Sequence, residues 1–384
     1  MQPNVLLGGL TAEVFLADYW QKKPLLIKAA IPNFTGLLTP NALAGLACES
    51  EVQSRIVQFK KKQWSVKNGP FKAKDFAKLP EQNWTLLVQS VNHHLPEAAA
   101  LLEQFNFIPH ARLDDLMVSY APDGGGVGPH FDSYDVFLLQ GSGQRLWKIS
   151  HQTDLSIVEG APLRILQTFD TAQEWLLSAG DMLYLPPHLA HWGTAVGDDC
   201  MTYSIGFRAP KHDELAYEFL GFMQDQLSQA QSQIGMYADA DLTLQKHPGA
   251  ISEAMIEKVE VILNKVTWQH KDIGQFLGQY LSEPKLHVTF EPNKPINLTT
   301  FDKHMANKGL TLDLQSQLLF VEHGDTTTFF MNGEYCVLPE TECDVLKHLA
   351  DFRHIPPQTS LLASVHNTLH AWYLDGYVRF SSSK

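Results

Sequence analysis

The feature that most constrains the fold is a series of short segments, between about residues 85 and 208, that are rich in β-branched and aromatic side chains. Clusters of Gly, Pro and Asp break these segments at short intervals, as is typical of strands joined by turns. This spacing predicts an antiparallel barrel or sandwich, interrupted by a helix near 96–105. We expect Gly141 and Gly143 to form a tight reversal between two strands. The expected strands are 84–91, 116–122, 134–141, 145–150, 181–187 and 200–210.

Helical periodicity appears on both sides of this region. Apolar residues repeat at the spacing of one helix face, and Ser, Thr or Asp precedes several of these repeats as a candidate N-cap. The expected helices are 11–21 (capped by Thr11), 40–50, 213–228 (capped by Asp213), 252–266 (capped by Ser252) and one that starts near Asp272, with a polar connecting loop over 231–250.

The last hundred residues mix helices and strands. Asn332-Gly333 and Asp375-Gly376 each lie between apolar segments, and such dipeptides favour two-residue hairpin turns. Between them, the spacing of Val345, Leu346 and Leu349 predicts a helix over 339–354. A small α+β domain with a terminal hairpin has the outline of a winged helix.

Composition excludes several classes of protein. The 384 residues, 44% hydrophobic and 18% charged, are typical of a globular chain of two or three domains. The net charge of −13 repels phosphate backbones and anionic membranes and favours a basic partner. No N-terminal targeting pattern, no run of roughly 18 apolar residues and no C-x-x-C pair is present. We therefore expect a soluble cytoplasmic protein that binds neither membranes nor a specific nucleic acid.

His130 and Asp132 form the first part of a candidate metal site. On an extended strand, residues i and i+2 project from the same face, about 7 Å apart along the backbone. Both side chains can therefore converge on one ion. An H-x-D pair by itself is a weak signal, because a chain with 17 His contains one readily.

A third ligand makes the signal more specific. His191 follows Asp132 by 59 residues, just past an apolar strand and a turn that contains Pro186 and Pro187. Two His and one carboxylate are the facial triad that holds non-haem Fe(II) and leaves positions open for a cosubstrate and O₂. His188 competes for the third position, but we expect it to be exposed on the turn.

Arg145 lies on a strand between apolar neighbours, where a buried guanidinium is costly unless an anion pairs with it. The anion can be a structural carboxylate of the chain. It can also be the far carboxylate of a 2-oxoacid such as 2-oxoglutarate, whose other end would chelate the metal.

Thr202 and Ser204 place two hydroxyls on one face of the last strand of the region. An inward polar face would cradle a cosubstrate, and an outward one would face solvent. The glycines at 124–126 and 128 lack the Lys-Ser/Thr of a phosphate loop, so we expect a flexible lip beside the site.

At these residues the chain resembles the bacterial ribosomal oxygenases of the JmjC type. The resemblance covers nearly the whole chain in layout, although the C-terminal third matches by layout only. The segments that carry it are ADYWQKKPLLIKAA (17–30), GGGVGPHFDSYDVFLLQGSGQRLW (124–147), LYLPPHLAHWG (183–193) and MTYSIGFRAP (201–210).

Members of that family are Fe(II)- and 2-oxoglutarate-dependent enzymes that use O₂ to hydroxylate an arginine of a large-subunit ribosomal protein. The resemblance implies that His130, Asp132 and His191 are the catalytic metal ligands. It further implies that Arg145 binds the side-chain carboxylate of 2-oxoglutarate. Thr202 and Ser204 fall on the strand that completes the cosubstrate pocket.

The resemblance also implies a fold that is mainly β with helices. A double-stranded β-helix of the cupin/JmjC type would occupy 1–210, a helical dimerisation segment 211–283, and a winged-helix-like α+β domain 284–384. We therefore expect a homodimer that acts on a basic ribosomal protein, without established DNA binding by its last domain.

Two alternatives stay open at this point. The same oxygenase chemistry can act on Asn, His or methyl-lysine of another protein, because loops around the site mouth choose the target. The chain can also be a non-catalytic cupin protein that binds ribosomes, although the intact ligand set and Arg145 argue against this.

Overall fold

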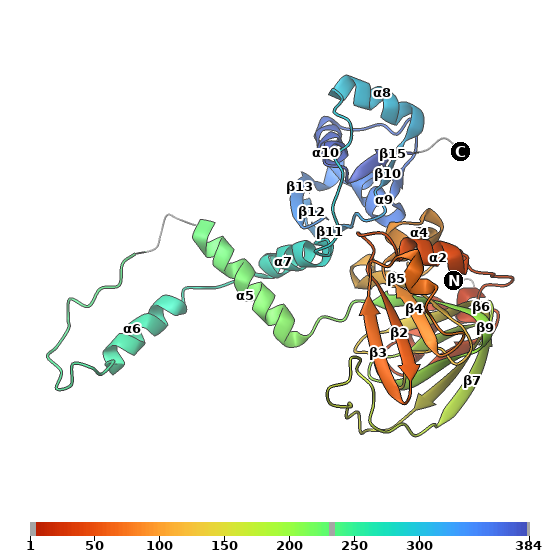
Figure 1. Ribbon diagram of the computed structural model, residues 1–384. Coiled ribbons are helices and arrows are strands. Elements are labelled where there is room, and N and C mark those ends of the chain that lie inside the picture. Colours follow the sequence, from red (N-terminus) through yellow and green to blue (C-terminus); the bar gives the residue numbers. More distant parts are fainter. Residues whose placement is uncertain (1–4, 230–234, 382–384) are drawn as a thin grey trace. The chain divides into compact units, whose positions relative to one another are not determined.

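A computed structural model of the chain describes residues 5–229 and 235–381 and divides it into two compact units (Figure 1). The first unit comprises Met1–Ala209 with Leu286–Thr289, and the second comprises Pro210–Lys285 with Phe290–Lys384. The division into three domains at 210 and 283 stays a prediction.

None of the helices in the described ranges combines the length and the apolar composition that crossing a lipid bilayer requires.

The first unit is built on one nine-stranded antiparallel sheet, in agreement with the expected all-antiparallel architecture. Its strands follow the order β1-β8-β6-β9-β5-β4-β2-β3, and β7 pairs with β6. The strands are β1 Leu25–Ile27, β2 Ser54–Lys60, β3 Gln63–Asn68, β4 Trp84–Val88, β5 Leu113–Ala121, β6 Val136–Ser150, β7 Gln173–Ser178, β8 Met182–Leu185 and β9 Ala190–Phe207.

The two faces of this sheet belong to different clusters, because successive side chains of a strand point to opposite faces. One face packs on the large apolar cluster beneath the N-terminal helices, and we call it the helix-covered face. We call the opposite face, which carries a smaller cluster, the inner face. The helix-covered face includes Phe137, Leu139, Met182, Tyr184, Tyr203 and Ile205. The inner face includes Val136, Leu138, Trp147, Ile149, Leu183 and Leu185.

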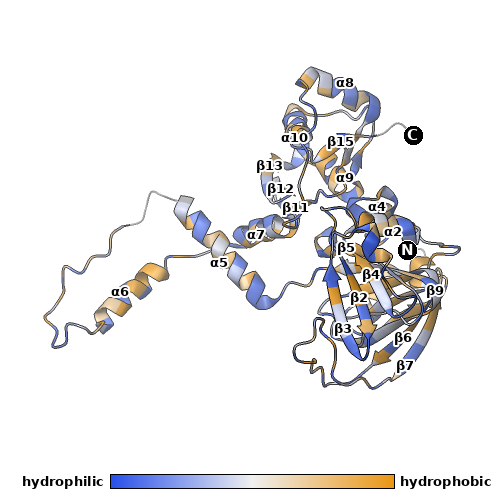
Figure 2. Ribbon diagram, in the orientation of Figure 1, coloured by the Kyte–Doolittle hydropathy of each residue, from blue (hydrophilic) through white to orange (hydrophobic). Residues whose placement is uncertain are grey.

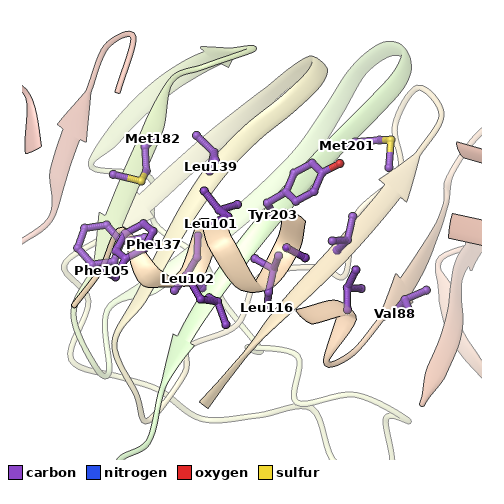
Figure 3. Packing of buried hydrophobic residues seen from close by; sticks show 14 of the residues in the cluster. Val88, Leu101, Leu102, Phe105, Leu116, Phe137, Leu139, Met182, Met201 and Tyr203 are labelled. Atoms are coloured by element: carbon purple, nitrogen blue, oxygen red, sulfur yellow. The ribbon is translucent and has the colours of Figure 1, made fainter. Parts of the chain in front are cut away.

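Short helices supply the apolar cover of the helix-covered face (Figure 3). Helix α1 begins after Thr11, whose side chain accepts a hydrogen bond from the Val14 amide, which confirms the predicted N-cap. The predicted helices near 40–50 and 96–105 are present as α2 and α4. The helices of this unit are η1 Val5–Leu7, α1 Ala12–Asp18, α2 Pro40–Leu46, α3 Ala73–Phe76, η2 Val91–His93, α4 Pro96–Glu103 and η3 His110–Arg112.

The predicted reversal at Gly141 and Gly143 is wrong, because 136–150 form the single strand β6. The pairing of β6 with β9 shifts register twice, between Gln140 and Ser142 and between Ser142 and Gln144. Glycine is needed here, since Gly143 has φ +60° and a Cβ at this position would lie 2.8 Å from the Cys200 Cα.

The irregularity changes which residues face inward. Before it, the even-numbered Val136 and Leu138 lie on the inner face. After it, the odd-numbered Trp147 and Ile149 lie there instead. Arg145, two residues before Trp147, therefore also points to the inner face.

The second unit begins with three helices, α5 His212–Gln229, α6 Glu253–Leu263 and α7 His270–Ser282. Ser252 caps α6 as predicted, with its side chain accepting from the Met255 amide. Asp213 is not the N-cap of α5, because the helix already includes His212; its carboxylate lies in the first turn, where it complements the helix dipole. The expected loop over 231–250 begins with 231–234, which lie outside the described residues.

The rest of the second unit has its own core around Phe301, Leu346 and Leu369. Asn332-Gly333 joins two paired strands, as predicted. Its elements are α8 Leu298–Lys308, β10 Leu310–Leu312, β11 Leu318–His323, β12 Thr326–Met331, β13 Glu334–Pro339, η4 Glu340–Glu342, α9 Asp344–Phe352, β14 His354–Ile355, α10 Ala363–Leu374 and β15 Val378–Phe380.

The hairpin predicted at Asp375-Gly376 is wrong, because these residues end helix α10. Gly376 has φ +83°, and its amide donates to the Tyr373 carbonyl. The Tyr377 amide donates to the Trp372 carbonyl at 2.8 Å. This pair of bonds is a Schellman cap, which uses the same left-handed glycine that a hairpin turn would use.

Candidate metal centre

The first two predicted ligands lie on an irregular segment rather than on a regular strand. His130 forms an isolated antiparallel bridge with His191, at the start of β9. The His130 amide donates to the His191 carbonyl at 2.9 Å, and the His191 amide donates to the His130 carbonyl at 2.8 Å. Backbone pairing therefore brings together two ligands that are distant in the sequence.

The third side chain completes the group. In the described part of the chain, His130, Asp132 and His191 are the one set of three potential ligand residues whose donor atoms lie within 4.8 Å of one another. Asp132 Oδ2 lies 3.9 Å from His130 Nε2 and 3.6 Å from His191 Nε2. The His188 amide donates to the Asp132 carbonyl at 2.7 Å, which holds the segment in place.

Both imidazoles are held in the orientation that metal binding requires. Nδ1 of His130 lies 2.9 Å from the Gly128 carbonyl, and Nδ1 of His191 lies 2.9 Å from the Leu189 carbonyl. A carbonyl only accepts, so each Nδ1 carries the proton and each Nε2 presents its lone pair. Both lone pairs are directed toward the region of Asp132.

The electrostatics of the buried imidazole favour the same state. Burial and the neighbouring His130 lower the pKa of His191 to about 4. His191 is therefore neutral near neutral pH, as a metal ligand must be. His188 is exposed on the turn, as predicted, so the structure brings His191 and not His188 into the group.

Arg145 is buried, with 4% of its surface exposed, on the same strand as Trp147. Its Nε donates to Thr202 Oγ1 at 2.9 Å, whereas Nη2 has no hydrogen-bond partner. No carboxylate pairs with it among the residues that the structure describes, so the alternative of a structural ion pair is not supported. A buried guanidinium with an unused donor is suited to binding an anion.

Thr202 and Ser204 are both buried, which rules out the solvent-facing alternative. Their neighbours Tyr203 and Ile205 belong to the helix-covered face, so the two hydroxyls lie on the inner face. Thr202 Oγ1 donates to Gln140 Oε1 at 3.0 Å while it accepts from Arg145. Thr202 therefore orients the guanidinium.

Several buried polar atoms on the inner face have no hydrogen-bond partner, which is unusual for a protein core. Ile56 of β2 and Leu86 of β4 belong to the helix-covered face, so their neighbours Arg55 and Thr85 lie on the inner one. Most buried polar atoms in proteins are hydrogen-bonded, so a group of exceptions on one face indicates a binding cavity. The buried unpartnered atoms of this unit, among those described, are Arg55 Nε, Thr85 Oγ1, Arg145 Nη2 and Trp147 Nε1.

The glycine segment before His130 is not the flexible lip that we expected. Gly124 and Gly125 exchange backbone hydrogen bonds with Ala195, at 3.0 and 2.8 Å. A Cβ on Gly126 would lie 2.4 Å from the Gly193 carbonyl oxygen. The glycines therefore allow the backbone to pack tightly against β9 and hold His130 in position.

Sequence reasoning treated Trp147 only as an apolar neighbour, but its ring lies beside the ligands. Its centroid is 5.8 Å from that of His191, and the Arg145 Cζ is 5.8 Å from it on another side. Gly193 makes room for the indole, since a Cβ there would lie 2.6 Å from the ring. The packing of its ring beside His191 and Arg145 identifies this residue as part of the site.

Replacing Gly193 by Ala is expected to reduce turnover roughly 10-fold to 100-fold, because the added Cβ displaces the indole that supports His191. Metal affinity measured by calorimetry would fall with it. Gly45→Ala is the matched control, because a Cβ there meets nothing within 4 Å. Normal metal affinity and turnover in Gly193→Ala would show that the indole position does not matter.

Tyr134 marks a negative region next to the ligands. Partial burial raises its pKa, and the charges of Asp132, Asp115 and Asp114 raise it further. The charge of Arg55 acts in the opposite direction, and Asp114 Oδ1 lies 3.6 Å from Arg208 Nε. The carboxylates still outnumber Arg55 among the charges that act on this phenol, which favours a cationic side chain beside Asp132.

Comparisons with known proteins agree with this geometry. The family described as the JmjC domain matches residues 100–215, and the ROXA-like winged helix matches residues 265–379. The chain is 37% identical over 286 residues to the ribosomal protein uL16 3-hydroxylase of Escherichia coli, covering 73% of this chain and 74% of that protein. It is 44% identical over 211 residues to a probable ribosomal oxygenase of Haemophilus influenzae, covering 54% and 52%.

Solved structures show the same fold. The chain matches the Escherichia coli ribosomal oxygenase YcfD with a TM-score of 0.80 at 32% identity, covering 97% of this chain and 98% of that one. It also matches YcfD in complex with cobalt and 2-oxoglutarate, with a TM-score of 0.80 at 31% identity, covering 97% and 99%. These matches confirm the expected fold class, a JmjC/cupin domain followed by a winged-helix domain.

Proposed function

Because the chain belongs to the family of JmjC-domain ribosomal oxygenases that includes the uL16 3-hydroxylase, we propose that it is an Fe(II)- and 2-oxoglutarate-dependent protein hydroxylase. Its substrate would be the large-subunit ribosomal protein uL16, on which the named relative acts. The target would be an arginine side chain.

The observation that carries this proposal is the donor set. Two imidazoles with free Nε2 atoms and one carboxylate oxygen lie within 4.8 Å of one another, and this His₂-carboxylate set is the one that non-haem Fe(II) oxygenases use. His130, Asp132 and His191 would hold the metal. A bound Fe(II) supplies the oxidising chemistry, in which 2-oxoglutarate and O₂ become succinate and CO₂ while one oxygen atom enters a C–H bond.

The rest of the inner face would bind and orient the cosubstrate. Arg145 offers the free Nη2 to the far carboxylate of 2-oxoglutarate, and Thr202 holds the guanidinium in place. Ser204 would contact the same ligand from the next inward position of β9. Burial of these groups keeps water from the ligand, which strengthens each charged hydrogen bond.

Charge supports a cationic target. Asp132, Asp115 and Asp114 outnumber the one cation, Arg55, among the charges that act on Tyr134 beside the metal ligands. The net charge of −13 steers a basic protein toward the enzyme. Because uL16 is a ribosomal protein, we further propose that the enzyme acts in the cytoplasm. Binding of a specific nucleic acid is not expected.

Incubating the protein with Fe(II), 2-oxoglutarate, O₂ and isolated ribosomal proteins tests the function. We expect succinate to form and uL16 to gain one oxygen atom on an arginine, detected by mass spectrometry of its peptides. An added oxygen on Asn or His, or loss of a lysine methyl group, would keep the chemistry and change the target. No turnover with any basic protein would leave only the non-catalytic alternative.

We also propose that the helical segment 211–283 forms a homodimer. Its helices leave several apolar side chains exposed, and α6 is apolar along much of its length (Figure 2). Exposed apolar side chains gathered on one segment favour an interface. They include Leu220 (62%) and Leu227 (41%) on α5, and Met255 (42%), Val259 (37%) and Ile262 (45%) on α6.

Replacing Leu220 and Ile262 together by Glu is expected to convert a dimer into a monomer in sedimentation experiments at micromolar concentration, because two charges cannot be buried in an apolar interface. Gln224→Glu adds a charge at an exposed polar position of α5 and serves as the control. A monomeric unmodified protein at this concentration would remove the proposed role of the segment.

A further inference from the structure

Trp147 carries a buried polar atom for which the fold provides no partner. Only 6% of the residue surface is exposed, and Nε1 has no hydrogen bond. A buried N–H is ordinarily satisfied, because burial without a partner costs it the hydrogen bond that it had with water. An apolar residue would fill this position without that cost.

The position of Trp147 indicates what its N–H meets. On the paired strand β9, Arg145 lies opposite Ala195, Trp147 opposite Gly193, and Ile149 opposite His191. Trp147 therefore lies one step from Arg145 and one step from the metal ligand, on the same face as both. A ligand that extends from the metal to the guanidinium must pass this ring.

The indole is held in one orientation. Its ring packs against the Cα of Gly193 and lies between the guanidinium of Arg145 and the imidazole of His191, 5.8 Å from each. Arg145 Nη2, two residues away on the same face, is also unpartnered. Two buried donors at successive inward positions of one strand, neither with an acceptor, are complementary to a single carboxylate.

We propose that the Trp147 indole N–H donates a hydrogen bond to the far carboxylate of bound 2-oxoglutarate, next to Arg145. This inference rests on the proposed function and adds to it a second donor that fixes the position of the cosubstrate. Trp147 thus has two tasks, because its ring supports His191 and its N–H binds the ligand.

Trp147→Phe tests the hydrogen bond, because Phe keeps an aromatic ring and loses the N–H. In calorimetry on cobalt-loaded protein, we expect 2-oxoglutarate to bind about 10-fold to 100-fold more weakly, as for the loss of a hydrogen bond to a charged group. Pyruvate, a 2-oxoacid without the far carboxylate, is expected to bind both proteins equally. Equal weakening for both acids, or none for 2-oxoglutarate, would overturn the proposal.

A second variant separates the N–H from the packing of the ring. Placing β-(3-benzothienyl)alanine at position 147 keeps the bicyclic shape and replaces the N–H by sulfur. We expect weaker 2-oxoglutarate binding with an equal or higher melting temperature of the ligand-free protein, since an unsatisfied donor is removed. A purely structural role would instead lower the melting temperature and leave the affinity for 2-oxoglutarate unchanged.

Trp175→Phe is the matched control. Trp175 lies opposite Trp147 on β7 and packs against the same cluster, but it is only half-buried and its N–H is not among the buried unpartnered atoms. Its 2-oxoglutarate affinity should stay unchanged. Failure of the unmodified protein to bind 2-oxoglutarate would count against the proposed function, whereas normal binding by both position-147 variants would count only against Trp147.

Discussion

Asp132→Ala is expected to abolish metal-dependent turnover, because it removes the only anionic donor of the His130, Asp132 and His191 group. The loss should exceed the roughly 10-fold to 100-fold effect that is typical of residues behind the ligands. Succinate formation and the mass of the uL16 peptides measure the activity, and calorimetry measures metal affinity. Asp132→Asn, which keeps the shape without the charge, should fail as well.

Thermal unfolding separates loss of metal from loss of fold. A bound metal stabilises the folded chain by about 2.7 kcal/mol when its concentration is 100 times the dissociation constant. We expect the variant to unfold at the same temperature as the metal-free protein and to lose the increase that metal produces. Asp154→Ala removes a carboxylate whose hydrogen bonds stay within its own loop, and it should retain that increase.

The choice between His191 and His188 can be tested in the same way. His191→Ala should lose metal binding, whereas His188→Ala should retain it, because His188 is exposed outside the group. The reverse result would show that the third ligand is misassigned.

Arg145→Met has the second largest expected effect. Removing one partner of a buried charged pair costs about 2–5 kcal/mol, so 2-oxoglutarate should bind at least about 30-fold more weakly. Metal affinity should not change, since Arg145 is not a ligand. Arg145→Lys should recover only part of the affinity, because an ammonium lacks the planar fork that matches a carboxylate.

The same substitution has an opposite effect on stability. In the ligand-free protein, Arg145 Nη2 is buried without a partner, so replacing the guanidinium by an apolar side chain should leave the melting temperature equal or higher. Lower stability together with unchanged 2-oxoglutarate binding would mean that Arg145 is a structural residue. Gln144→Met, at the preceding exposed position of β6, controls for the change in the strand.

The sequence was sufficient to predict those elements that are fixed by interactions between neighbouring residues. The N-caps of Thr11 and Ser252 and the Asn332-Gly333 hairpin each depend on a few neighbouring residues. Asp375-Gly376 was mispredicted because a left-handed glycine serves a hairpin and a helix C-cap equally well. Which of the two forms depends on what precedes it, and here a helix packs its buried face on the domain core.

The sequence likewise predicted part of the candidate site, and tertiary packing determined the rest. The residue types and spacing of His130, Asp132 and His191 were sufficient to predict a metal site and its ligands as a hypothesis. The regular strand assumed for the first two was wrong, because the bridge to His191 positions them. The hydroxyls of Thr202 and Ser204 were equally compatible with either face until the packing of Tyr203 assigned them to the inner one.

The chain by itself determined which chemical groups are available: two imidazoles, a carboxylate, a guanidinium and an acidic surface. Only the tertiary structure decided which of them meet. The irregularity at Gly141–Gly143 reverses the inward face of β6, so that Arg145 and Trp147 point toward His191. The alternation of side chains along a strand is local. Which side chains face inward after such an irregularity is set by pairing with β9, whose residues lie 52 to 62 positions further along the chain.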